Sequence, residues 1–183
     1  MKPPDARSVM TTLGVALIAG IGLVGCSSGG DEPVDFVGAP VEGTAGDLSE
    51  VDRRVLDESV APGHGDLVAA AADDPEVCGA LAGAVEASKA LDAASGEELV
   101  ALLAPSQAPM DKAATVLSAK GFTLTAEHYG RYRDALAATE VDIDMSDQAS
   151  RDRANQRFEQ VQALGAGSTA TELGGLAVVC GVS

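Results

Sequence analysis

The chain of 183 residues carries 28 acidic and 12 basic side chains, which gives a net charge of −16 at pH 7. Surfaces that bind nucleic acid need clusters of Lys and Arg, so this balance excludes nucleic acid as a partner. It also disfavours electrostatic docking on anionic lipids or anionic wall polymers.

The first 25 residues follow the pattern of a secretory signal peptide, in which a positively charged start precedes an apolar run and then small residues. Lys2 and Arg7 give a positive start, and residues 9–24 carry no charge. The uncharged run is short for a membrane-spanning helix, which needs about 20 apolar residues. Because no twin-Arg pair is present, we expect export of the unfolded chain through the general route.

The signal ends at Leu23-Val24-Gly25-Cys26. This segment resembles the lipobox of bacterial lipoprotein precursors at every position. The resemblance implies a diacylglyceryl group on the Cys26 thiol, cleavage before Cys26, and a lipid-anchored protein on the extracytoplasmic face of the cell membrane. Two or three acyl chains would make that anchor stable. The composition, rich in Ala, Gly, Val and Asp and poor in Lys, resembles that of proteins from high-GC bacteria such as actinobacteria.

We predict three parts in the chain. Residues 1–25 are the signal peptide, residues 26–46 are the lipidated N-terminus and a flexible tether, and residues 47–183 form one helical domain. Gly, Pro, Ser and acidic residues dominate the tether, which has no helical period.

From residue 47 onward apolar residues recur at helical spacing, and no segment alternates as a strand does. We therefore predict an all-α domain, a small bundle of about six or seven short helices closed by one disulfide. The expected helical segments cover residues 47–60, 75–94, 96–104, 109–120, 125–140, 146–164 and 169–180, and residues 67–72 form a short apolar segment.

Local capping signals place the helix boundaries. A cap followed by proline at Asp74-Pro75 predicts a firm helix start, and Pro105 predicts a helix end. Further caps or capping boxes are expected at Asp47 with Glu50, Ser95 with Glu98, Thr125, and Thr169 with Glu172.

If Cys26 is lipidated, Cys78 and Cys180 are the two remaining cysteines. An even pair in an exported domain predicts a disulfide. It would close a loop of about 100 residues and stabilise the domain by about 4–5 kcal/mol in the chain-entropy model. Neither a C-x-x-C nor an H-E-x-x-H pattern occurs, so we predict no metal site and no catalytic thiol.

The candidate ligand-binding residues are His128, Tyr129 and Tyr132. Tyr and His ligate haem iron in some proteins. The alternative, which we favour, places both tyrosines in the core and His128 on a helix surface. His64 lies between glycines and is expected in a mobile loop.

The segment from Asp142 to Ser146 is similar to the start of a calcium-binding loop. Asp147 and Arg153 stand where that loop needs Gly and Glu, so we expect a helix-start loop instead.

No G-x-S-x-G, S-x-x-K or phosphate-binding loop is present. We therefore predict a non-enzymatic envelope lipoprotein without a cofactor, whose domain binds a protein partner or assists an envelope assembly. One alternative is a carrier of haem or an apolar metabolite. Another is a hydrolase whose catalytic residues form no local motif.

Overall fold

The computed structural model describes residues 46–182 of the protein. This part of the chain contains seven α-helices, one 3₁₀ turn and no strand, which confirms the predicted all-α class. The elements are α1 (Glu50–Ser59), α2 (His64–Ala70), η2 (Ala71–Asp73), α3 (Pro75–Ala93), α4 (Glu97–Ala119), α5 (Thr123–Asp142), α6 (Gln148–Leu164) and α7 (Ser168–Cys180). The predicted signal peptide and Cys26 lie outside the described residues, as does nearly all of the predicted tether.

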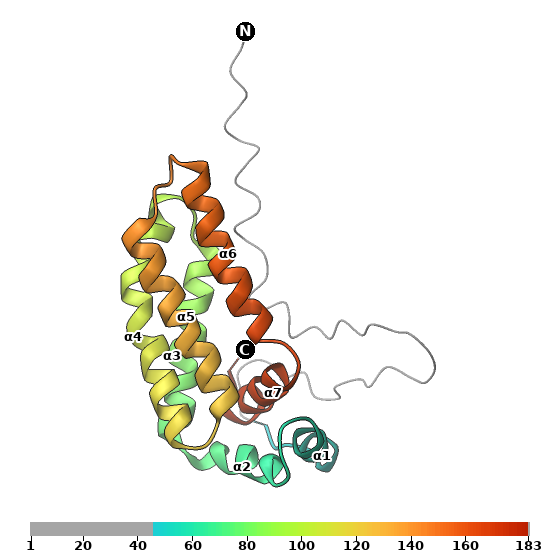
Figure 1. Ribbon diagram of the computed structural model, residues 1–183. Coiled ribbons are helices and arrows are strands. Elements are labelled where there is room, and N and C mark those ends of the chain that lie inside the picture. The colour runs from blue at the N-terminus through green and yellow to red at the C-terminus, as the bar shows by residue number, and fades with distance from the viewer. Residues whose placement is uncertain (1–45, 183) are drawn as a thin grey trace, which may run out of the picture.

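The helices form a long part and a short end (Figure 1). In the long part α3 packs on α4, α4 packs on α5 and α5 packs on α6, so neighbours in sequence are neighbours in space. Helices α1, α2 and α7 gather at one end, where α7 contacts α1, α2, α3 and α5. The α5–α6 connection lies at the opposite end.

Three helices begin at acidic or hydroxyl side chains that accept the free N–H groups of the first turn. The Asp74 carboxylate accepts the N–H groups of Glu76 (3.0 Å) and Val77 (3.2 Å), and Pro75 follows it, as predicted. Helix α1 has its capping box at Ser49 and Asp52, so the prediction of Asp47 with Glu50 is wrong. Asp147 caps α6.

The predicted caps at Ser95, Thr125 and Thr169 are also wrong. Helices α4 and α7 start after Gly96 (φ 59°) and Gly167 (φ 61°), and neither start has a side-chain cap bond. A positive φ suits glycine because it has no Cβ, so the turn of the chain sets these starts. Thr125 lies inside α5, whose N-cap residue is Phe122.

Helix α4 continues through Pro105 and Pro109, where we predicted a break. Each proline removes one backbone hydrogen bond and costs about 3 kcal/mol in a helix interior. The two prolines are four residues apart and therefore lie on one face. On the inner face the continuous helix buries an apolar row, and this burial offsets the cost: Leu103, Met110, Ala113 and Leu117, none more than 1% exposed.

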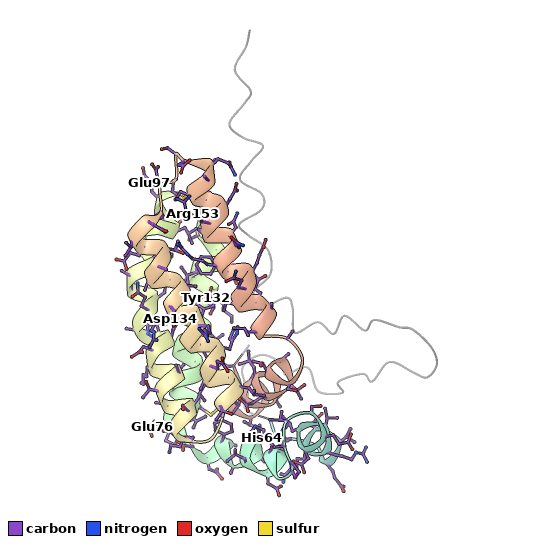
Figure 2. All side chains as sticks on the ribbon, viewed as in Figure 1. His64, Glu76, Glu97, Tyr132, Asp134 and Arg153 are labelled. Atoms are coloured by element: carbon purple, nitrogen blue, oxygen red, sulfur yellow. A yellow bond between two sulfur atoms is a disulfide. The ribbon has the colours of Figure 1, made fainter. Side chains whose placement is uncertain are left out.

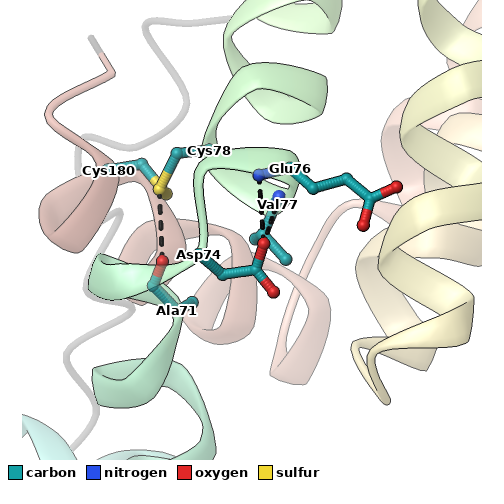
Figure 3. Close-up of a disulfide and its surroundings, with 6 residues drawn as sticks. All are labelled: Ala71, Asp74, Glu76, Val77, Cys78 and Cys180. Atoms are coloured by element: carbon teal, nitrogen blue, oxygen red, sulfur yellow. Dashed lines mark hydrogen bonds between the residues drawn. A yellow bond between two sulfur atoms is a disulfide. The ribbon is translucent and has the colours of Figure 1, made fainter.

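The predicted disulfide between Cys78 and Cys180 is confirmed, with the Cα atoms 5.1 Å apart (Figure 3). It joins the first turns of α3 to the last residue of α7. The Ala71 carbonyl oxygen lies 3.4 Å from Cys78 Sγ, which is a close contact and not a hydrogen bond because this sulfur carries no hydrogen. The long part and the short end of the molecule are therefore covalently linked.

Candidate functional site

The three candidate ligand residues, His128, Tyr129 and Tyr132, all lie on α5 and all are buried. The ring centroids of His128 and Tyr129 are 5.4 Å apart, and those of Tyr132 and Phe158 of α6 are 5.8 Å apart. The surface position expected for His128 is wrong, whereas the core position expected for the tyrosines is right. Tyr132 lies on α5, in the long part of the molecule (Figure 2).

Burial controls the protonation of this aromatic cluster. Desolvation lowers the pKa of His128, an effect that the nearby Val161 backbone partly opposes. Desolvation raises the pKa of Tyr129 and Tyr132, and the neighbouring Asp92 charge adds to the rise for Tyr132. The two tyrosines therefore stay neutral, and the neutral form of His128 is favoured.

His128 faces the end of α6 closely. Its Nδ1 atom is buried without a hydrogen-bond partner. A Cβ atom placed on Gly165 would lie 3.0 Å from His128 Cε1, so a larger residue there would require the imidazole ring to shift. The arrangement is that of a packed core, with the rings in contact with one another.

A small recess lies between α4, α5 and α6, near the α5–α6 connection. Its volume is about 20 Å³, which is room for about one water molecule. Pockets for small molecules commonly measure about 300–1,000 Å³. The lining is almost wholly apolar: Leu99, Val100, Leu103, Thr139, Ile143, Met145, Arg151, Ala154 and Phe158. This recess is too small to hold a haem or a comparable metabolite.

The chemically most unusual group in the described residues is the carboxylate of Glu172 on α7, which is 0% exposed. Its Oε1 atom accepts the backbone N–H of Thr125 at 2.7 Å. Its Oε2 atom lies 2.6 Å from Nε2 of His64 on α2. The last two atoms are not aligned as in a straight hydrogen bond, so we describe them as a close polar contact.

This cluster of Glu172, His64 and Thr125 joins three helices. Thr125 is the third residue of α5, and its N–H is one of the groups that a helix start leaves without a helical partner. The negative charge of a carboxylate at that position is also stabilised by the positive end of the α5 helix dipole. His64 begins α2, and its ring packs edge-on against Phe122, with centroids 6.2 Å apart. The cluster thus ties α7 to the starts of α2 and α5.

His64 was expected in a mobile loop, and that prediction is wrong. His64 is 8% exposed and is held by the packing of α2 on α1. The Gly65 N–H donates to the Asp57 carboxylate at 2.7 Å, and a Cβ on Gly65 would lie 2.4 Å from the Arg53 carbonyl oxygen. Gly65 therefore reflects a close helix contact that spacing alone does not reveal, whereas Gly63 has a positive φ of 82° and no atom within 4 Å of an added Cβ.

The acidic segment that is similar to a calcium loop is used for helix contacts. Asp142 makes two hydrogen bonds to the Arg157 guanidinium, at 2.7 and 2.5 Å, and this interaction lowers the pKa of Asp142. Asp144 accepts the N–H and the hydroxyl of Ser146, and these bonds lower the pKa of Asp144. Among residues 46–182 no group of three His, Cys, Asp or Glu side chains is placed to hold a metal ion.

None of the described helices is by itself long and apolar enough to cross a membrane; α6 and α7 meet that criterion only as a pair bent by 78°.

No protein-family model matches the chain, and we found no curated protein and no solved structure with significant similarity to it.

Proposed function

We propose that this protein is a lipid-anchored, extracytoplasmic envelope protein whose helical domain binds a protein partner and has no enzymatic activity. The anchor part of this proposal is supported by the signal peptide and by the lipobox that ends at Cys26. The partner part is supported by the way in which the domain uses its polar groups and exposes one of its ends.

The observation that carries the non-enzymatic function is that the buried polar cluster links helices to one another. The Glu172 carboxylate holds the start of α5 and contacts His64, both within the core. No cleft accompanies the pair, because Glu172 is 0% exposed. A catalytic acid or base must come within hydrogen-bond reach of a substrate, which this burial prevents.

The end of the domain at the α5–α6 connection is the surface that we favour for partner binding. Val141 is 87% exposed there, and Ile143 and Met145 line the apolar recess nearby. The described chain enters at the other end, where the Gly46 N–H donates to the Val178 carbonyl of α7 at 3.0 Å. A tether attached at Gly46 would leave the Val141 end free for contact with other molecules.

The anchor is tested by labelling cells with a fatty-acid analogue. We expect the wild-type protein to take up the label and to sediment with membranes. The Cys26→Ser variant should lose the label, because the acceptor thiol is absent. Label retained by Cys26→Ser would overturn the lipid anchor at this residue.

Partner binding is tested with a photo-reactive amino acid placed at position 141 in intact cells. Position 51, where Val51 of α1 is 49% exposed at the opposite end, provides the matched control. We expect position 141 to give one defined protein adduct and position 51 to give none. Equal adducts from both positions would contradict the favoured surface, and a stoichiometric co-purifying small molecule would favour the carrier function instead.

A further inference from the structure

The disulfide of this domain joins two cysteines that are far apart in the chain. Cys78 lies near the start of α3, Cys180 is the last residue of α7, and 102 residues separate them. A chain that is exported from its N-terminus presents Cys26 and Cys78 to the outside before Cys180. The native partner of Cys78 is therefore the last cysteine to arrive.

The competing pair, Cys26 with Cys78, closes the smaller loop. Its separation is about half of the 102 residues between Cys78 and Cys180. The probability of closing a flexible loop falls as about the three-halves power of its length, so the wrong pair forms about threefold more often in an unfolded chain. Arrival order and loop length thus favour the same wrong disulfide.

The native cysteine pair lies close to the first described residue, Gly46. Gly46 is held against Val178, two residues before Cys180 in α7. Both sulfur-bearing residues, Cys78 and Cys180, are partly exposed at this end of the domain.

A chain with the wrong disulfide would lose the covalent attachment of α7. That helix also carries Glu172, whose carboxylate holds the start of α5. The domain would then rely on non-covalent contacts alone to keep α7 in place. Removal of the Cys26 thiol before oxidation avoids this outcome.

We infer that acylation of Cys26 precedes oxidation of the other two cysteines and thereby directs them to each other. This inference rests on the proposed lipid anchor. Transfer of a diacylglyceryl group replaces the S–H bond of Cys26 with an S–C bond, and a thioether cannot form a disulfide. Cys78 and Cys180 then lose two electrons and two protons to the disulfide of a thiol–disulfide oxidoreductase, which leaves as a dithiol.

The test compares two full-length variants in the producing cells. Leu23→Asp disrupts the lipobox and keeps all three cysteines, and Leu23→Asp with Cys26→Ser is the matched control. Newly made chains are pulse-labelled, quenched in acid and alkylated, and their disulfides are mapped without reduction. We expect the early disulfides of Leu23→Asp to contain Cys26–Cys78 in about threefold excess over Cys78–Cys180. The control and the wild type should contain only the native pair.

The same competition is measured in purified full-length Leu23→Asp protein that is reduced in denaturant and then oxidised, so degradation in cells does not obscure the result. Native pairing from the outset, with Cys26 recovered as an alkylated thiol in both settings, would overturn the inference. The fatty-acid label on the wild-type protein is scored separately. Its absence would overturn the proposed anchor, while the pairing in Leu23→Asp would still report whether the Cys26 thiol competes.

Discussion

Replacing Glu172 with alanine removes a carboxylate that contacts two other helices inside the core. The change leaves the Thr125 N–H without its acceptor and His64 without its polar neighbour, 2.6 Å away. The Glu172 side chain is 0% exposed and the His64 side chain is 9% exposed, so water does not replace the lost contacts. We therefore expect a large loss of stability from this one substitution.

The magnitude follows from the cost of leaving buried polar groups without partners. A buried polar group left without its partner typically costs about 1–3 kcal/mol, and this substitution leaves two such groups. The free energy of unfolding of a domain of this size is about 5–15 kcal/mol, so Glu172→Ala removes a substantial part of it. Glu172→Gln keeps the shape and an acceptor for the Thr125 N–H, and we expect it to lose about 1–2 kcal/mol.

The assay is denaturant unfolding followed by helical circular dichroism, with the disulfide intact in every variant. A double-mutant cycle with His64→Leu isolates the contact between the two side chains, and we expect a coupling of about 0.5–3 kcal/mol. A loss below about 1 kcal/mol for Glu172→Ala would refute the reasoning. Additive effects of the two substitutions would show that Glu172 acts through Thr125 alone.

Three further changes test other parts of the fold. Because burial lowers the pKa of His128, the unfolded state binds more protons than the folded state once the pH falls below about 6.5, and the free energy of unfolding then decreases as the pH falls. His128→Phe should reduce this dependence of the free energy of unfolding on pH by up to about 1.4 kcal/mol per pH unit, as measured by unfolding curves at several pH values. Gly65→Ala should destabilise, since its Cβ would lie 2.4 Å from the α1 backbone, whereas Gly79→Ala, with no atom within 4 Å, should stabilise by about 0.5–1 kcal/mol; equal thermal shifts would contradict the proposed close contact. Replacing both Cys78 and Cys180 with alanine should cost about 4–5 kcal/mol by the same denaturant assay, and an unchanged midpoint would mean that the disulfide adds nothing.

The sequence predicted the features that depend on near neighbours along the chain. The pair Asp74-Pro75 was sufficient to place the start of α3, because both the cap and the fixed proline backbone act within one helical turn. The disulfide was predicted by elimination among three cysteines. The break at Pro105 was wrong because a local penalty does not include the apolar row that α4 buries on its inner face.

The buried polar cluster was missed because its members are distant in sequence. Glu172 follows Thr169 at the spacing of a capping box, so a local pattern assigned it to its own helix. In the fold its carboxylate instead accepts from Thr125, which lies 47 residues earlier. The predictions that His64 and His128 are exposed were wrong for the same reason, since burial depends on which other helices pack over a residue. The only sequence signal was a set of polar residues on otherwise apolar helix faces.

Helix α7 brings these observations together. Gly175 allows α1 and α2 to approach, because a Cβ there would lie 3.1 Å from Val68 and 3.2 Å from Leu56. Glu172 holds the start of α5, and Cys180 is bonded to α3. One helix of thirteen residues thus contacts both parts of the molecule through three different residue types. Its acidic and sulfur-containing side chains would attract attention as reactive groups, yet their contacts assign both to holding the helices together. Any partner-binding residues are therefore to be sought on the exposed faces away from α7.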